Sequence, residues 1–294
     1  MNQTRAIPTC KGPDPDTRTP RYTPPPGACD THCHIFGPGA VFPYAADRAY
    51  TPPDAPYEGL VKLHRILGIS RAVIVHASCH GSDMAVTLDG IARSGGTMRG
   101  VCVVDPDVTD AELARLHAGG IRGVRFNFVK HLGGMPDMAF FQRVLAQVEP
   151  LGWHVVLHLD AQDVVKLAPV ISAIRIPFVI DHMGRVRAKD GVEQPAFRQL
   201  QQLMDNPLAW VKVCGAERIS STGAPFRDAL PFIRALAAQA PDRLLWGTDW
   251  PHPNIAGDMP NDGDLVDLLA EAIEDEALRH KVLVDNPTRL YWND

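Results

Sequence analysis

Eight short runs of mainly apolar and β-branched residues recur along this chain of 294 residues, and a longer segment follows each of them. The runs cover residues 28–34, 71–78, 100–105, 123–128, 154–159, 178–182, 210–215 and 244–249. Because they are nearly continuous in apolar residues, they are typical of strands in a parallel sheet that is covered on its outer face. Eight is also the number of strands that a closed (β/α)₈ barrel requires.

Five other segments place apolar residues at the i, i+3, i+4 and i+7 spacing of a helix that buries one face. They cover residues 111–118, 139–148, 196–204, 229–240 and 265–284. The alternation predicts an α/β fold, a (β/α)₈ TIM barrel that forms a single domain over residues 28–294. The alternative is an open doubly wound sheet. Such a sheet usually carries a glycine-rich phosphate loop after its first strand, and no GxGxxG occurs here.

Two segments stand apart from the alternation. Residues 1–27 are rich in Pro, Thr and charge and end in three consecutive prolines and a glycine, which predicts an extended N-terminal arm on the surface or on a partner. Residues 36–56, rich in prolines and aromatics, are long for a βα loop. Loops of that length are usually functional, so we expect a lid over a site.

Composition excludes several classes of protein. Apolar residues make up 45% of the chain and charged residues 21%, as in an average globular domain. The net charge of −5 and the scattered Lys and Arg argue against nucleic-acid binding. No apolar run is long enough to span a membrane, and the N-terminus lacks the apolar core of a signal peptide, so we expect a cytoplasmic protein. The six scattered cysteines predict free thiols, and a homodimer is compatible with the sequence.

Histidines and one aspartate gather at the ends of the predicted strands. The first run ends with His32 and His34, which are two residues apart and so point to the same face. His158 is the second-to-last residue of the fifth run, His182 is the last of the sixth, and Asp249 is the last of the eighth. In a barrel these strand ends meet at one mouth. Any one of these histidines alone would be taken for a core residue. Together they predict an active site whose nitrogen and oxygen donors suit a zinc ion.

Several ordered motifs carry a resemblance to a known family. They are the His32/His34 pair, ASCHG at 77–81, GVRFNF at 123–128, DHMG at 181–184 and WGTDWPHPN at 246–254. With residues 21–27 and 290–292 they extend over nearly the whole chain, which resembles the amidohydrolase superfamily and, within it, the branch of lactone hydrolases. The resemblance implies hydrolysis of a doubly anionic lactone from aromatic-compound catabolism.

The resemblance also implies roles for single residues. Asp249 would be the general base that activates water, and His182 would bind the lactone carbonyl. Arg125 and Arg218 would hold substrate anions, although either could be a structural ion-pair member. Three further residues match positions that line the pocket of the family: Tyr50, Ser78 and Asn254.

Two departures from the branch bear on substrate and metal. His131 stands where a branch member has an arginine, and His158 stands where it has a tyrosine. Most amidohydrolases use a fifth-strand histidine as a metal ligand, which implies one zinc ion held by His32, His34, His158 and Asp249. No lysine lies in the fourth predicted strand, so a binuclear centre is not expected.

Three functional hypotheses follow. The first is a lactonase, with 4-sulfomuconolactone as the expected substrate, 2-pyrone-4,6-dicarboxylate as the alternative, and His131 beside the bound anion. The second is a non-oxidative decarboxylase; those relatives commonly carry an acidic residue in the first-strand motif, whereas His32 and His34 are both kept here. The third is a degenerate barrel that only binds ligands, and the presence of Asp249 argues against it.

Overall fold

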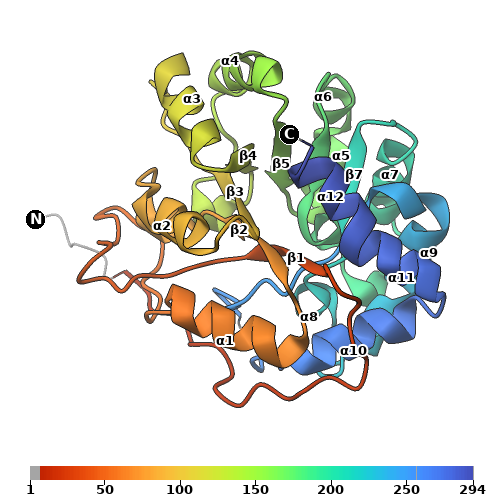
Figure 1. Cartoon of the computed structure of the whole chain (residues 1–294). Coiled ribbons are helices and arrows are strands. Elements are labelled where there is room, and N and C mark those ends of the chain that lie inside the picture. The colour runs from red at the N-terminus through yellow and green to blue at the C-terminus, as the bar shows by residue number, and fades with distance from the viewer. Residues whose placement is uncertain (1–6, 256, 294) are drawn as a thin grey trace, which may run out of the picture.

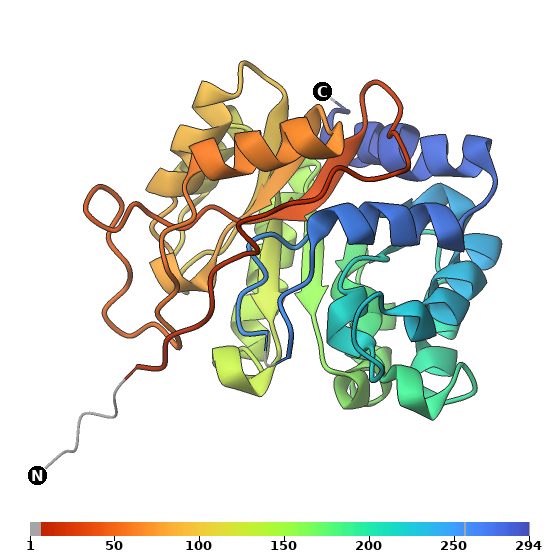
Figure 2. The ribbon, with the colours of Figure 1, turned by 90° about the horizontal axis from the view of Figure 1, so that it is seen from below.

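The computed structural model describes residues 7–255 and 257–293 and shows eight parallel strands in the order β1 to β8, with helices around them (Figures 1 and 2). The strands are β1 (Cys29–Cys33), β2 (Arg71–Val75), β3 (Met98–Cys102), β4 (Ile121–Asn127), β5 (His154–His158), β6 (Phe178–Ile180), β7 (Ala209–Lys212) and β8 (Leu244–Leu245). Hydrogen bonds join β1 to the residues after β8, from Thr31 N to Trp246 O and from His34 N to Trp250 O. These bonds bring the first and last strands together, and the predicted barrel is confirmed.

Helices follow the strands along the chain. They are α1 (Tyr57–Leu67), α2 (Ala85–Arg93), α3 (Asp110–Ala118), α4 (Met138–Val148), α5 (Ala161–Lys166), α6 (Ala168–Ser172), α7 (Pro195–Leu203), α8 (Ala216–Ile219), α9 (Leu230–Gln239), α10 (Asp262–Ala272), α11 (Glu276–His280) and α12 (Asn286–Tyr291). None of the helices in the described ranges has the length and apolar character needed to cross a membrane.

One predicted helix was wrong. The periodicity of residues 265–284 suggested a single helix, but α10 ends at Ala272 and α11 begins at Glu276. Ile273 between them has an extended backbone (φ −118°, ψ 93°), and the Asp275 side chain accepts a hydrogen bond from Leu278 N, which starts a new helix. The capping aspartate therefore outweighed the apolar spacing.

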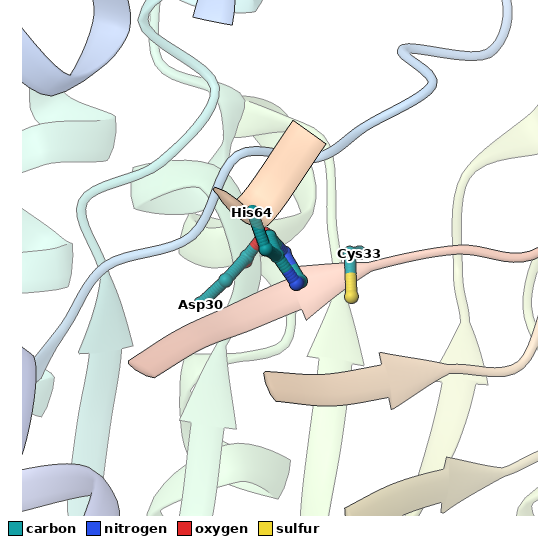
Figure 3. Close-up of side chains that lie close together, drawn as sticks. All are labelled: Asp30, Cys33 and His64. Carbon is teal, nitrogen blue, oxygen red and sulfur yellow. The ribbon is translucent and has the colours of Figure 1, made fainter. Parts of the chain in front are cut away.

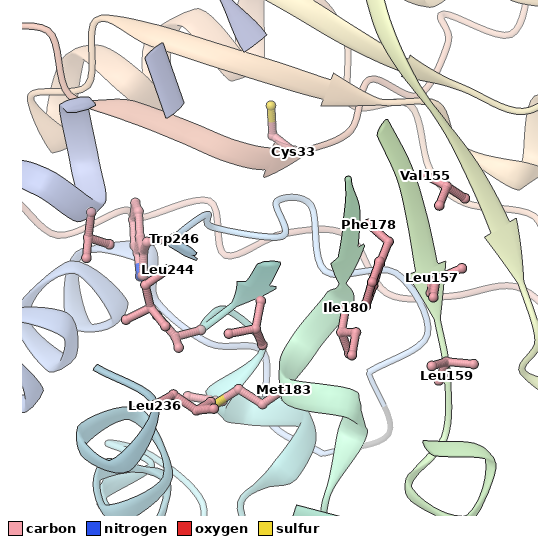
Figure 4. Close-up of a cluster of buried hydrophobic side chains, with 14 of the residues drawn as sticks. Cys33, Val155, Leu157, Leu159, Phe178, Ile180, Met183, Leu236, Leu244 and Trp246 are labelled. Atoms are coloured by element: carbon pink, nitrogen blue, oxygen red, sulfur yellow. The ribbon is translucent and has the colours of Figure 1, made fainter. Parts of the chain in front are cut away.

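The strands bury both of their faces. Outward side chains such as Leu157, Ile180 and Trp246 pack in the layer between barrel and helices (Figure 4). Inward side chains form a second cluster inside the barrel, with Val156 and Val179 among its members, and it includes Leu290 and Tyr291 of α12. Apolar residues therefore fill the barrel interior, and the buried polar side chains described below lie toward the carboxyl ends of the strands.

The N-terminal segment carries no helix between residue 7 and β1 and packs on α10. In Figure 1 its red trace passes below α1 and α10 before it enters β1. The nearly buried Asp267 carboxylate accepts hydrogen bonds from Arg21 N (2.8 Å), Tyr22 N (2.9 Å) and the Arg18 guanidinium (2.7 Å). One carboxylate thus holds two points of the arm, Arg18 and Arg21–Tyr22, to α10.

We predict that Asp267→Asn loosens the arm. The amide loses the charge that receives the Arg18 guanidinium and keeps a single acceptor oxygen, so the free energy of unfolding should fall by about 1–3 kcal/mol. Urea unfolding measures this loss, and limited trypsin digestion should cut faster at Arg18 and Arg21. The matched control is Glu271→Gln on the same helix, whose exposed pair with Arg227 should contribute less than about 1 kcal/mol. Equal unfolding energies for the two variants would contradict the role of Asp267.

Candidate active site

The four histidines and the aspartate predicted from the strand ends lie together in the structure. The distances from Asp249 Oδ1 are 3.2 Å to His34 Nε2 and 3.5 Å to His32 Nε2. His182 Nε2 is 4.0 Å from Asp249 Oδ2, and the rings of His158 and His182 are 5.5 Å apart. All five residues are buried.

A small cavity opens above Asp249. It has a volume of about 30 Å³ and is lined by His34, Tyr50, Ala77, Ser78, Arg125, His131, Leu132, His158, His182, Arg185, Arg218, Asp249, Pro253 and Asn254. Every substrate-contact residue that the sequence suggested lines this cavity, while His32 lies buried against Asp249. The space holds only about two water molecules. A larger cavity of about 700 Å³ adjoins it and shares Arg185 and Arg218.

Left-handed backbone positions the two residues expected to be catalytic. The φ angles of His182 and Asp249 are 50° and 67°, in a region that side-chain-bearing residues rarely adopt. Glycines make room beside them: a Cβ on Gly215 would lie 2.7 Å from His182 Nδ1, and one on Gly247 would lie 2.5 Å from His32 N. Such backbone strain costs about 1–3 kcal/mol per residue and is concentrated at functional sites. β6 and β8 end earlier than the predicted strands did, at Ile180 and Leu245, and His182 with its left-handed backbone lies two residues after β6.

Arg218 dominates the electrostatics of Asp249. Its Nε and Nη2 both lie 2.5 Å from Asp249 Oδ2. Burial alone would raise the pKa of Asp249, but the Arg218 charge, together with His182 and the His34 hydrogen bond, holds that pKa well below its usual value. Asp249 is therefore ionised.

The contacts of His34 place a positive charge or a proton beside Asp249. His34 Nδ1 lies 2.7 Å from the Val75 carbonyl, which can only accept, so Nδ1 carries a proton. A neutral His34 would then aim the bare lone pair of Nε2 at the ionised Oδ1 of Asp249, 3.2 Å away. That arrangement requires either a second proton on His34 or a cation between the two atoms.

The contacts of His182 leave it a hydrogen-bond donor toward the cavity. Its Nδ1 lies 3.3 Å from Cys214 Sγ, and burial raises the pKa of that thiol well above its usual value. The Cys214 S–H therefore donates to Nδ1, and Nε2 carries the ring proton. At 4.0 Å from Asp249 Oδ2, this N–H is too far away to bond the carboxylate.

A buried ion-pair cluster below the cavity was missed by the sequence reasoning. Lys212 of β7 is fully buried, with Nζ 3.1 Å from Asp181 Oδ1 and 3.0 Å from His32 Nδ1. Arg125 Nε lies 3.1 Å from Asp181 Oδ2. Lys212 and Arg125 outweigh burial and hold the pKa of Asp181 well below its usual value. The sequence did contain one signal for this cluster: a lysine, Lys212, at an inward position of an otherwise apolar strand.

Arg185 was also missed. It follows His182 in the same left-handed turn, lines both cavities, and donates from Nε to Asp160 Oδ1 at 2.9 Å. Its guanidinium adds a third positive charge to the cavity wall beside Arg125 and Arg218.

The donor atoms fit a single metal ion. Ligand atoms of His32, His34 and Asp249 lie within 4.8 Å of one another, and His32 Nε2 has no hydrogen-bond partner in the described part of the chain. His32 Nδ1 lies 3.0 Å from Lys212 Nζ, which can only donate, and 3.2 Å from Asp181 Oδ1, which can only accept. The Nε2 lone pair is free for a cation in the tautomer whose Nδ1 proton is directed to Asp181. His158 stands outside this group: its Nδ1 bonds Asn127 Oδ1 (2.9 Å), and its Nε2 is buried without a partner among residues 7–255 and 257–293.

A second group of metal-type side chains, Asp30, Cys33 and His64, has a structural role (Figure 3). Asp30 Oδ2 contacts His64 Nε2 at 3.1 Å and Thr248 Oγ1 at 2.6 Å, and Oδ1 accepts from the backbone N–H of His32 and of Thr248 at 3.0 Å each. These donors occupy the carboxylate, so it offers little to a metal. Asp30 instead ties the backbone of His32 to that of the residue before Asp249.

A buried imidazole lies behind Arg218. His252 Nε2 is 3.0 Å from Asp262 Oδ1, and Nδ1 is 3.6 Å from Glu217 Oε1. Burial would lower the pKa of His252, but the two carboxylates raise it to about 10. Glu217 Oε1 in turn lies 3.7 Å from Arg218 Nε. Charges of alternating sign thus extend from Asp262 to Asp249.

Comparison with known proteins agrees with the barrel fold. Residues 29–292 match the family described as amidohydrolase. The 4-sulfomuconolactone hydrolase of Hydrogenophaga intermedia is 45% identical over 97% of this chain and 95% of its own length. The 2-pyrone-4,6-dicarboxylate hydrolase of Comamonas testosteroni is 43% identical over 93% of this chain and 92% of its own. A crystal structure from Acinetobacter baumannii with citric acid bound superimposes with a TM-score of 0.81 at 27% identity and covers 90% of this chain and 99% of its own.

We predict that acid destabilises the protein steeply. Burial lowers the pKa of His32 to about 4 and of His76 and His154 to about 3, and it lowers those of His158 and His182 well below the usual value. Between the unfolded pKa of about 6.5 and these lower values, only the unfolded state binds the protons. Burial of these five histidines therefore costs no stability through proton binding above about pH 6.5. Below that pH, the free energy of unfolding declines as the pH falls toward 4.

Urea unfolding at pH 7.5 and pH 5.0 measures this effect. Each histidine contributes up to about 1.4 kcal/mol per pH unit. His252, whose pKa is raised to about 10, loses part of its contribution above about pH 6.5, so between pH 7.5 and 6.5 it opposes this effect by up to about 1.4 kcal/mol. An unchanged free energy of unfolding at pH 5.0 would show that these histidines are not buried in the neutral form.

Proposed function

Because the chain belongs to the amidohydrolase family, we propose that it hydrolyses the ester bond of a doubly anionic lactone, with 4-sulfomuconolactone as substrate and 2-pyrone-4,6-dicarboxylate as the alternative. The observation that carries the proposal is an ionised, buried Asp249 in a cavity that also presents the His182 N–H and the guanidinium groups of Arg125, Arg185 and Arg218.

The reaction follows from the positions of these groups. Asp249 takes a proton from a water molecule, and the resulting hydroxide attacks the lactone carbonyl carbon. His182 Nε2–H donates to the carbonyl oxygen and stabilises the negative charge that develops there. The ring C–O bond then breaks, and Asp249 returns its proton to the leaving oxygen. Water is consumed, and a ring-opened acid is the product.

The three arginines suit a substrate with two negative groups. Arg125 contacts Asp181 through Nε, and Arg185 contacts Asp160 through Nε. Each guanidinium therefore retains N–H groups for a ligand. Guanidinium groups bind planar carboxylates and sulfonates through charge-assisted hydrogen bonds. A neutral lactone would leave this charge uncompensated.

Two histidines support the choice of substrate. His131 is exposed at the rim of the cavity, and His158 is buried with Nε2 unpartnered in the described residues. The exchange of an arginine and a tyrosine for histidines favours the sulfonated lactone over the pyrone.

We further propose that one zinc ion is held by His32, His34 and Asp249. His158, which the resemblance implied as a fourth ligand, lies near this group. This assignment supplies the positive charge that the His34–Asp249 contact requires. When bound, zinc lowers the pKa of water and polarises a carbonyl oxygen. His182 stays outside the ligand set and keeps its N–H for the substrate.

The substrate is tested with a lactone panel. Wild-type protein should hydrolyse 4-sulfomuconolactone faster than 2-pyrone-4,6-dicarboxylate, measured as acid release, and Asp249→Asn should reduce kcat by about 10²–10⁴-fold because the base is lost. The control Asp258→Asn makes the same change at an exposed position of the same loop and should keep full activity. Failure to hydrolyse either lactone, or release of CO₂ from aromatic acids instead, would refute the proposal.

The metal is tested by elemental analysis. Purified protein should contain close to one zinc ion per chain, and His34→Asn should lower that content because it removes a ligand atom and weakens the group. Exhaustive chelation should reduce activity, and added zinc should restore it. Fully active protein without metal would instead assign the extra proton to His34 and leave Asp249 as a base alone.

A further inference from the structure

Arg218 covers one oxygen of Asp249, Oδ2. Its Nε and Nη2 both lie 2.5 Å from Oδ2, and Nη2 also donates to Pro253 O at 3.1 Å. The other oxygen, Oδ1, faces His32 and His34. In this arrangement Asp249 has no oxygen free to accept a proton from an incoming water molecule.

Arg218 borders open space and a second carboxylate, so its guanidinium has an alternative position away from Asp249. It lines the 30 Å³ cavity and the adjoining 700 Å³ cavity, where Arg185 and Arg187 add positive charge. On its other side, the buried Glu217 carboxylate lies 3.7 Å from Arg218 Nε. Both Glu217 oxygens lack a hydrogen-bond partner within the described ranges. A guanidinium that leaves Asp249 would therefore keep a second carboxylate beside it.

The geometry points to Arg218 as a latch on the base: an anionic group of the substrate draws the guanidinium off Asp249 Oδ2 and frees that oxygen to accept the proton of water. This inference rests on the proposed lactone hydrolysis. It assigns to the substrate anion a role beyond binding, because the charge recognised by Arg218 also activates the base. A neutral lactone can enter the cavity but leaves Asp249 covered.

The latch makes a prediction that simple anion binding does not. A ligand shifts an equilibrium only by its differential affinity for the two states, and any anion that binds Arg218 better when it is off Asp249 should open the latch. A small anion should therefore accelerate hydrolysis of a neutral lactone. If Arg218 only held the substrate anion, a separate anion would have no effect on a neutral substrate.

The experiment uses the full chain and α-angelica lactone, a neutral enol lactone. In wild-type protein, methanesulfonate that replaces chloride at constant ionic strength should raise kcat/KM for this lactone by at least about fivefold, the low end of ordinary coupling between two sites. In Arg218→Gln the neutral lactone should be hydrolysed faster than by unliganded wild type, without further activation by methanesulfonate. The same variant should lose about tenfold or more in kcat/KM for the anionic lactone, because a charge-assisted hydrogen bond is lost.

Arg227→Gln, the same change at an exposed arginine paired with Glu271, is the control and should behave as wild type. The inference is overturned if wild type hydrolyses the anionic lactone but methanesulfonate does not accelerate the neutral one; the proposed function then stands. It is also overturned if Arg218→Gln, shown to be folded by circular dichroism, loses activity equally on both lactones. Failure to hydrolyse any lactone refutes the proposed function itself. If Arg218→Gln does not fold, the wild-type comparison alone decides.

Discussion

Two buried carboxylates, Asp181 and Asp249, determine how the interior of this barrel is arranged. Neither could stay ionised in a buried position without opposite charge within hydrogen-bonding distance. Lys212 and Arg125 meet Asp181, and Arg218 meets Asp249. The valine-rich interior near α12 needs no such compensation. The barrel is thus divided along its axis into an apolar half that supplies stability and a charged half that supplies chemistry.

The charged half is supported by histidines whose Nδ1 contacts fix the position of a ring proton. The Val75 carbonyl sets the tautomer of His34, and the Cys214 thiol sets that of His182. Nδ1 of His34 and both ring nitrogens of His182 therefore have a defined donor or acceptor role before any ligand arrives. Such preorganisation lowers the reorganisation that a developing oxyanion would otherwise require.

Sequence reasoning predicted the barrel and the residues that line the cavity, for physical reasons that do not extend to the whole site. Strand faces and strand ends follow from local spacing, so His32, His34 and Asp249 could be placed at one mouth. The roles of Lys212 and Arg185 depend on neighbours that are far away in the chain, and no local pattern contains that information. The break after Ala272 was missed because the capping Asp275 competes with apolar periodicity. Whether one helix or two forms depends on the free energy of the cap relative to that of the continued helix, and spacing alone does not give either value. The left-handed backbone at His182 and Asp249 overrides propensity and is stabilised by tertiary contacts alone.

The contact between β1 and the residues that follow β8 has a consequence for folding kinetics. His34 and Asp249 are separated by 215 positions, and Asp30 joins the same two regions through Thr248. Contacts between such distant positions raise the contact order, which slows folding far more than it lowers stability. A chain that had docked only its first six strands would lack Asp249 at the site and would therefore have no assembled active site. Catalytic competence should appear in the last step of folding, so recovered activity reports complete refolding more strictly than recovered helical signal does.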